Sequence, residues 1–210
     1  MAGWDSLKVA VPEGELDGVA VERFSVDEEA SRWTYLREGG RGVPPGTYTR
    51  LRVGKFTWMS DTPAEILDHW PATDQIRKPR TERVLINGLG LGMIVKFALE
   101  QEHVKHVDVV EIDERIVKLV GPTYAADERV TIHRADAFDK MVEWPRNSHW
   151  DVVWHDIWRD IDLDNMPAIA TLKRSYARRS GWQGAWSQDI LTRQRDRERR
   201  VDKRLEEFMG

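Results

Sequence analysis

Three alternating glycines follow a short apolar segment near the middle of the chain. Residues 84–86 read Val-Leu-Ile and run directly into the hexapeptide NGLGLG at residues 87–92, and a helical pattern follows over residues 93–99. A glycine turn between a strand and a helix lets a ligand lie close to the backbone, and the helix offers unpaired N–H groups at its N-terminus. This order of elements constrains the chain to an α/β fold with a ligand site at the turn.

Three further segments after the glycine turn have the pattern of buried strands. Residues 106–112, 129–133 and 150–155 each predict a strand, and helical stretches separate them. Strands that alternate with helices at intervals of roughly 20–25 residues predict βαβ units and a parallel sheet with right-handed crossovers. The predicted fold class is therefore α/β, a Rossmann-like parallel sheet with flanking helices.

The segments on either side of this core have a different character. Polar and apolar residues alternate over 19–24 and 47–58, which predicts a small β-rich extension with a hairpin turn at Gly54. No strand pattern follows residue 156, so we expect the sheet to be truncated after its fourth strand and the C-terminal part to be a helical tail. The predicted domains are an N-terminal hairpin and helix extension, a Rossmann-like core and a basic helical tail, over residues 1–80, 81–165 and 166–210.

The composition excludes several classes of protein. The 210 residues include no cysteine, which rules out disulfides, zinc–thiolate sites and a thiol nucleophile. No apolar run reaches the ~18 residues of a membrane-spanning helix, and residues 1–16 lack the apolar region of a secretory signal. We therefore expect a cytoplasmic protein without a membrane partner.

An acidic side chain follows or ends each of the last three predicted strands of the core. Glu111 lies in the second strand near its end, Asp136 follows the third, and Asp156 follows the fourth. Because ligands of open parallel sheets lie at the carboxyl ends of the strands, we expect these carboxyl groups to meet beside the glycine turn. Several acids in one crevice create a negative field, which favours a sulfonium cation over a dinucleotide pyrophosphate.

The glycine turn, together with the segments VVEID, RADAF and WDVVWHDIW, resembles class I S-adenosylmethionine-dependent methyltransferases, and most closely their spermidine-synthase-like branch. The resemblance covers about residues 81–160. It implies that the core binds S-adenosyl-L-methionine as its cofactor, with Glu111 on the ribose hydroxyls and Asp136 on the exocyclic amine of adenine. The cofactor-binding residues that it implies are Asn87, Gly88, Gly90, Gly92, Glu111, Ile112, Asp113, Asp136 and Ala137.

Asp156 is the predicted catalytic residue, because a carboxylate at a strand end can orient or deprotonate an amine or hydroxyl nucleophile. Trp154 and Trp158 flank it, and an aromatic wall beside a carboxylate suits a cationic or planar acceptor. The alternative for each indole is that it fills the core. The segment MSDTPAEILDH resembles the element that precedes the nucleotide fold of aminopropyltransferases. The predicted substrate-binding residues are therefore Asp61, Glu65, Trp154 and Trp158, and no metal site is predicted.

The resemblance implies a methyltransferase that acts on a small-molecule acceptor. Two alternatives remain open: a spermidine-synthase-like aminopropyltransferase, and a nucleoside-binding or partner-binding protein of the same fold that catalyses no transfer. A solvated amphipathic helix explains the basic residues of segment 173–179, so we expect no nucleic-acid partner. The open edge of the short sheet requires a cover, which the tail or a second copy of the chain could provide as a homo-oligomer.

Overall fold

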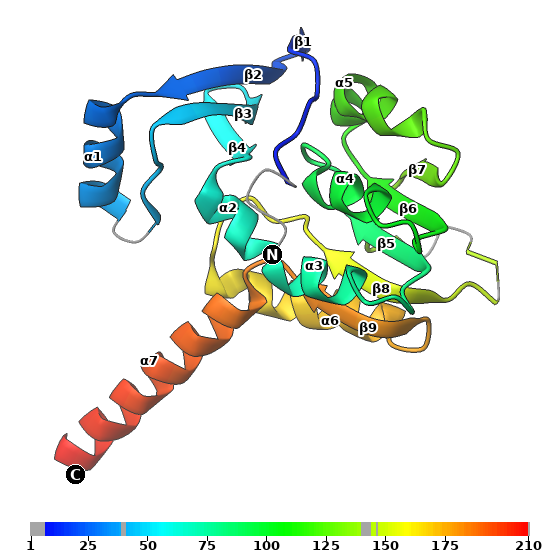
Figure 1. The fold of residues 1–210 in the computed structure, drawn as a ribbon. Helices are drawn as coiled ribbons and strands as arrows, with labels where there is room; N and C mark the ends of the chain where they lie inside the picture. Colours follow the sequence, from blue (N-terminus) through cyan, green and yellow to red (C-terminus); the bar gives the residue numbers. More distant parts are fainter. Residues whose placement is uncertain (1–6, 39–40, 140–143, 146, 210) are drawn as a thin grey trace.

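Two β-sheets organise the structure, a computed structural model that describes residues 7–38, 41–139, 144–145 and 147–209 (Figure 1). The N-terminal sheet has four antiparallel strands in the order β1-β2-β3-β4, and α1 (Glu28–Glu38) connects β2 to β3. Its strands are β1 (Gly14–Leu16), β2 (Val19–Val26), β3 (Gly46–Val53) and β4 (Phe56–Ser60). The predicted β-rich extension is confirmed, including the hairpin at Gly54, whose φ of 57° suits a glycine.

The second sheet is parallel throughout and has five strands in the order β7-β6-β5-β8-β9. Its strands are β5 (Arg83–Asn87), β6 (His106–Glu111), β7 (Val130–Arg134), β8 (Trp150–His155) and β9 (Ser180–Ala185). The first four confirm the predicted α/β fold with a Rossmann-like parallel sheet.

The prediction that the sheet ends after its fourth strand is wrong. The fifth strand, β9, has the sequence SGWQGA, which contains two glycines and no β-branched residue, so its pattern gives little indication of a strand. Tertiary packing requires a glycine in this strand: Gly184 pairs with Trp154 of β8, and a Cβ at position 184 would lie only 3.0 Å from the Trp154 ring. Trp182 then stacks on Trp154, with ring centroids 6.4 Å apart.

Helices cover both faces of the parallel sheet. On one face α3, α4 and α5 pack over the strands around the larger apolar core, whereas α6 covers β8 and β9 on the other face (Figure 1). The helices of the core region are α2 (Pro63–Asp68), α3 (Trp70–Ile76), α4 (Met93–Leu99), α5 (Glu114–Ala125), the short 3₁₀ helix η3 (Leu163–Asn165) and α6 (Met166–Tyr176).

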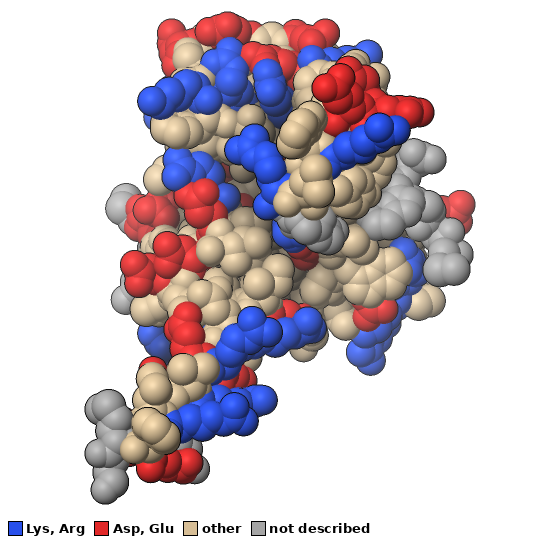
Figure 2. Space-filling view, turned by 90° about the vertical axis from the view of Figure 1, so that its left-hand side faces the viewer, with Lys and Arg blue, Asp and Glu red and all other residues tan. Residues whose placement is uncertain are grey.

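The last helix, α7 (Gln188–Met209), starts beside β9 and projects away from both sheets (Figure 1). Figure 2 shows basic and acidic side chains interspersed on the face that it presents, α7 included. Within the described ranges, no helix combines the length and the apolar character that a membrane crossing requires. The predicted helical tail thus contains helices, but β9 lies between them.

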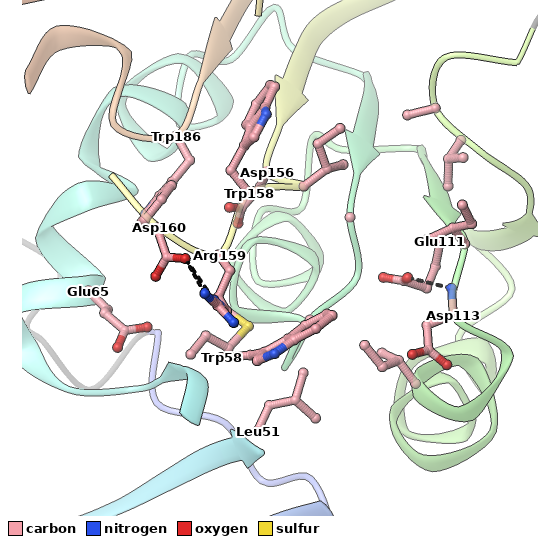
Figure 3. A pocket seen from close by; sticks show the side chains of 18 of the residues that line it. Leu51, Trp58, Glu65, Glu111, Asp113, Asp156, Trp158, Arg159, Asp160 and Trp186 are labelled. Atoms are coloured by element: carbon pink, nitrogen blue, oxygen red, sulfur yellow. Dashed lines mark hydrogen bonds and ion pairs between the residues drawn. The ribbon is translucent and has the colours of Figure 1, made fainter. Parts of the chain in front are cut away.

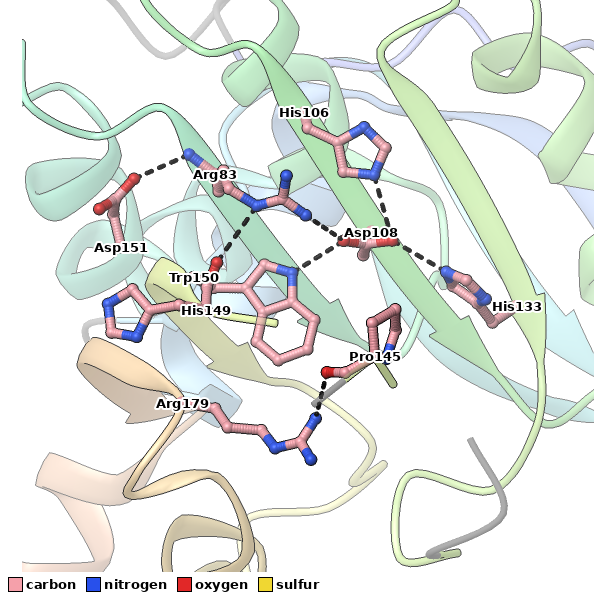
Figure 4. Close-up of polar contacts among 9 residues, drawn as sticks. All are labelled: Arg83, His106, Asp108, His133, Pro145, His149, Trp150, Asp151 and Arg179. Atoms are coloured by element: carbon pink, nitrogen blue, oxygen red, sulfur yellow. Dashed lines mark hydrogen bonds and ion pairs between the residues drawn. The ribbon is translucent and has the colours of Figure 1, made fainter. Parts of the chain in front are cut away.

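A buried carboxyl group organises the polar contacts on the α6 side of β6 (Figure 4). Asp108 is 4% exposed, and one of its carboxyl oxygens accepts a hydrogen bond of 2.8 Å from the indole N–H of Trp150. The other oxygen lies 2.9 Å from His133 Nε2 and 3.2 Å from His106 Nε2. Burial alone would raise the pKa of Asp108, but the bonds from His133 and Trp150 and the charge of His106 outweigh it and hold the pKa below its usual value.

We therefore expect Asp108→Ala to lower the free energy of unfolding by about 2–4 kcal/mol, because it leaves the buried indole N–H of Trp150 unpaired. Urea denaturation measures this change, and Asp74→Ala is a matched control, since the contacts of Asp74 with Lys78 and Gln75 are exposed to solvent. Because the pKa of Asp108 is lower in the folded state than in the unfolded state, its contribution to the free energy of unfolding is present above about pH 4. This contribution is lost as the pH falls through the folded-state pKa. Equal urea midpoints for the two variants would contradict this role.

Candidate active site

A pocket of about 630 Å³ lies beside the glycine turn, at the carboxyl ends of the parallel strands (Figure 3). It lies between this edge of the sheet and residues of β3, β4 and α2 from the N-terminal part of the chain. Most of the predicted site residues line it. These are Glu65, Gly88, Gly90, Glu111, Ile112, Asp113, Asp136, Ala137, Asp156 and Trp158.

Glu111 ties the glycine turn to the loop after β6. Its Oε2 accepts a hydrogen bond of 2.8 Å from the backbone N–H of Leu89, and its Oε1 accepts one of 2.8 Å from the backbone N–H of Asp113. Burial is the main cause that raises the pKa of Glu111, since the side chain is only 7% exposed. Each oxygen retains a lone pair, so the carboxylate can still accept two hydroxyl groups such as those of a ribose.

Two of the glycines are required by packing. A Cβ at Gly88 would overlap the backbone carbonyl of Asp156, so only glycine lets the turn pass the end of β8. Gly92 has a φ of 75° and starts α4, and a Cβ there would overlap the ring of Tyr124. Gly92 does not line the pocket, so its place in the structure shows a packing role.

The loops after β6 and β7 form the end of the pocket that the resemblance assigns to adenine. The Asp113 carboxylate accepts hydrogen bonds from the backbone and the guanidinium of Arg115, which fixes it as the N-cap of α5. Asp136 accepts a bond of 2.8 Å from the backbone N–H of Phe138. Ile112 is 65% exposed and presents an apolar side chain that a planar base could cover.

Asp156 lies directly after β8 and faces the pocket from the sheet (Figure 3). Its backbone N–H donates to the carbonyl of Asn87 at 2.7 Å, which joins the end of β8 to the glycine turn. Burial, together with the charges of Glu65, Asp68 and Glu111, raises the pKa of Asp156 to about 8. The isolated site therefore holds a proton on Asp156 at neutral pH.

Glu65 is the second carboxyl group at this end of the pocket. It accepts hydrogen bonds from the backbone N–H of Ser60 at 2.7 Å and from its hydroxyl at 2.8 Å, and burial raises its pKa to about 7. The two arginines that line the pocket, Arg41 and Arg159, form ion pairs with Asp68 and Asp160. The reacting end of the pocket is therefore acidic, and it favours a cationic ligand.

Besides Gly92, three predicted site residues do not line the pocket. Asn87 is fully buried and its amide nitrogen lies 2.8 Å from His155 Nδ1. Asp61 accepts hydrogen bonds from the backbone N–H groups of Thr49 and Val9, so it joins the N-terminal segment to β3 instead of facing a substrate. Trp154 lies within β8 and is fully buried in the larger core, under the helices that cover that face of the sheet.

Other lining residues were not predicted. Trp58 lies in β4 and Trp186 directly follows β9, so both reach the pocket from elements whose position in space the sequence pattern does not reveal (Figure 3). His69 connects α2 to α3 and also lines the pocket.

The chain matches no family model. It is 33% identical over 109 residues to a polyamine aminopropyltransferase of Prochlorococcus marinus (strain MIT 9515), which covers 49% of this chain and 37% of the relative. A polyamine aminopropyltransferase of Prochlorococcus marinus subsp. pastoris is 29% identical over 120 residues, which covers 52% of this chain and 41% of that protein. The chain thus spans about two fifths of the length of these curated relatives.

Among solved structures, the chain is similar to the spermidine synthase of Thermotoga maritima, with 15% identity and a TM-score of 0.42 over 68% of this chain and 44% of that one. It is also similar to an S-adenosylmethionine-dependent methyltransferase of Mesorhizobium loti, with 25% identity and a TM-score of 0.32 over 42% of this chain and 39% of that one. The sequence relatives confirm the predicted resemblance to the spermidine-synthase-like branch of the class I methyltransferase fold over about half of this chain.

Proposed function

We propose that this protein binds a sulfonium nucleoside related to S-adenosylmethionine and transfers its aminopropyl group to an amine. The observation that carries the proposal is the acidic reacting end of the pocket, where Asp156 and Glu65 lie and both lining arginines are ion-paired. Polyamine aminopropyltransferase is also the name of the curated sequence relatives.

The two ends of the pocket suit the two ends of such a donor. The glycine turn, Glu111 and Asp136 would hold the nucleoside, as in other open sheets that bind a ligand at the carboxyl ends of their strands. Decarboxylated S-adenosylmethionine carries a sulfonium and an ammonium group but no carboxylate. The acidic end attracts both cations, whereas it repels the carboxylate of S-adenosylmethionine itself.

The remaining space suits a cationic acceptor. Trp58, Trp158 and Trp186 line this part of the pocket, and indole faces attract ammonium groups. In the reaction the neutral amine nitrogen attacks the carbon next to sulfur, so that a C–N bond forms while the C–S bond breaks and its electron pair stays on sulfur. Asp156 orients the nitrogen and accepts its proton, and alignment of the two substrates supplies most of the rate enhancement.

Isothermal titration calorimetry with the nucleosides tests the donor. We expect decarboxylated S-adenosylmethionine to bind more tightly than S-adenosylmethionine, by about tenfold or more, because one buried carboxylate repulsion is worth about 1–2 kcal/mol at a partly solvated site. S-adenosylhomocysteine is the matched probe without a sulfonium charge. Tighter binding of S-adenosylmethionine would favour methyl transfer to a small molecule, and no binding of any of the three nucleosides would contradict the proposed function.

Glu111→Ala tests the nucleoside end. The change removes the predicted acceptor of the ribose hydroxyls and leaves the backbone N–H groups of Leu89 and Asp113 without their partner, so we expect donor affinity to fall by at least about 100-fold. Glu114→Ala on α5 is a control, because its carboxylate pairs with Lys118 and Arg134 outside the pocket. Unchanged affinity in a folded Glu111→Ala protein would show that the nucleoside binds elsewhere.

Asp156→Asn tests the reacting end. We expect donor affinity within a few-fold of wild type and kcat lower by about 10²–10⁴-fold, because the amide cannot take up a proton. The wild-type kcat/KM should rise with pH up to about 8, since the pKa of Asp156 is raised and only its ionised form accepts the proton. Asp164→Asn, an exposed change before α6, is the control. Normal turnover by Asp156→Asn would remove Asp156 from the mechanism.

A further inference from the structure

Two buried polar groups beside Asp156 have no hydrogen-bond partner among the residues that the structure describes. These are His69 Nδ1 and the indole Nε1–H of Trp154, and both side chains are at most 1% exposed. An unpaired buried polar group costs free energy, because it gave up its bonds to water on folding. Buried polar groups without a partner are rare in native proteins, so two of them next to one carboxyl group indicate a role in the function of the site.

Both groups are placed against the carboxyl of Asp156. His69 Nδ1 lies 3.7 Å from Asp156 Oδ2, slightly beyond hydrogen-bond distance. The indole N–H of Trp154 is close enough to lower the pKa of Asp156, in opposition to the stronger effects that raise it. A small movement of the Asp156 side chain would bring its oxygens within reach of both nitrogens.

The backbone of His69 is fixed by the junction of two helices. Its N–H donates to Ile66 in α2, and its carbonyl accepts from Ala72 and Thr73 in α3. The junction therefore fixes the main chain from which the imidazole reaches Asp156.

Aromatic contacts hold the Trp154 side chain. Its ring meets the His69 ring edge-to-face, with centroids 6.1 Å apart, and is stacked on Trp182 with an interplanar angle of 6°. The two nitrogens beside Asp156 thus belong to one rigid unit, which β9 completes by supplying Trp182.

We propose that His69 and Trp154 form a donor pair that holds the ionised carboxylate of Asp156 in the orientation needed for transfer. They are positioning residues, and the proposal rests on the proposed function of Asp156. When a cationic acceptor enters, Asp156 releases its proton to the solvent, and its carboxylate then accepts hydrogen bonds from His69 Nδ1–H and Trp154 Nε1–H. The donor pair costs free energy while its two nitrogens are unpaired and gains two hydrogen bonds once Asp156 is ionised, which explains why both nitrogens face this carboxyl group.

The charge state of His69 suits this role. Burial lowers its pKa to about 4, although the charge of Asp68 opposes the change, so the imidazole is neutral over the working range. The acidic groups around the unit are Glu65, Asp68, Glu111 and Asp156 itself. A neutral donor stabilises the Asp156 carboxylate without neutralising the field that attracts the acceptor.

Two variants remove one donor each with little change in shape. Trp154→Phe keeps an aromatic ring but removes the indole N–H, and His69→Leu keeps a similar volume without a polar atom. We expect each to lower kcat by about 10-fold or more, to change the KM of the donor nucleoside by less than about threefold, and to shift the midpoint of the kcat/KM profile to higher pH by about one unit. The pH shift follows because the ionised form of Asp156 loses a hydrogen bond.

A conservative variant and a control complete the set. In His69→Asn the amide nitrogen takes the place of Nδ1, so we expect most of the activity and the wild-type midpoint to return. Trp33→Phe removes an exposed indole on α1, outside the pocket, and should change neither value. Unshifted pH midpoints in both Trp154→Phe and His69→Leu, with an active wild type, would overturn the donor pair.

A second measurement separates the donor pair from the transfer reaction. In proton NMR of the wild-type protein, the Trp154 indole N–H, assigned by its loss in Trp154→Phe, should move downfield as Asp156 ionises near pH 8. The movement should be absent in Asp156→Asn. If the wild type shows it but transfers nothing, the proposed function fails and the donor pair stands. If the signal ignores the ionisation of Asp156, the donor pair is wrong, whatever the activity.

Discussion

The close approach of the glycine turn to the end of β8 is the contact on which the site depends. Only glycine fits at position 88, because any side chain would overlap the carbonyl of Asp156. The same approach allows the Asp156 N–H to bond to the carbonyl of Asn87. Two adjacent parallel strands thereby place the glycine turn and a carboxyl group side by side, and the pocket lies around them.

The acidic side chains of the pocket lose hydration free energy when they are buried. Hydrogen bonds from two backbone N–H groups offset part of this loss for Glu111, and bonds from Ser60 do so for Glu65. Within the described part of the chain Asp156 accepts no such backbone bonds, and burial is the main cause that raises its pKa to about 8, so the free protein retains a proton on Asp156 at neutral pH. A cationic ligand would release this proton and would turn an unfavourable arrangement of like charges into a favourable one.

Much of the parallel-sheet core was predictable from the sequence, because the residues that form its local pattern are also the ones that pack in its interior. The run Val84-Leu85-Ile86 is buried on both faces, and the glycines after it serve the turn that their spacing indicated. β9 was not predictable, because its conformation comes from pairing with β8 and from the Trp154–Trp182 stack, and neither contact is visible in SGWQGA. For the same reason Trp186 and Trp58 were missing from the predicted site: both belong to segments that only the fold brings to the pocket.

The sequence by itself determined the α/β core, the glycine turn and the carboxyl groups that end its strands, because period, spacing and residue chemistry are local properties. Tertiary structure alone decided which side chains reach the pocket. Trp154 and Trp158 flank Asp156 equally in sequence, yet Trp158 lines the pocket and Trp154 is buried, since Trp154 lies within β8 whereas Trp158 lies in the loop beyond the end of that strand. Asp61 and Glu65 likewise share one short segment. The carboxylate of Asp61 accepts hydrogen bonds from backbone N–H groups of distant residues, whereas Glu65 lines the pocket.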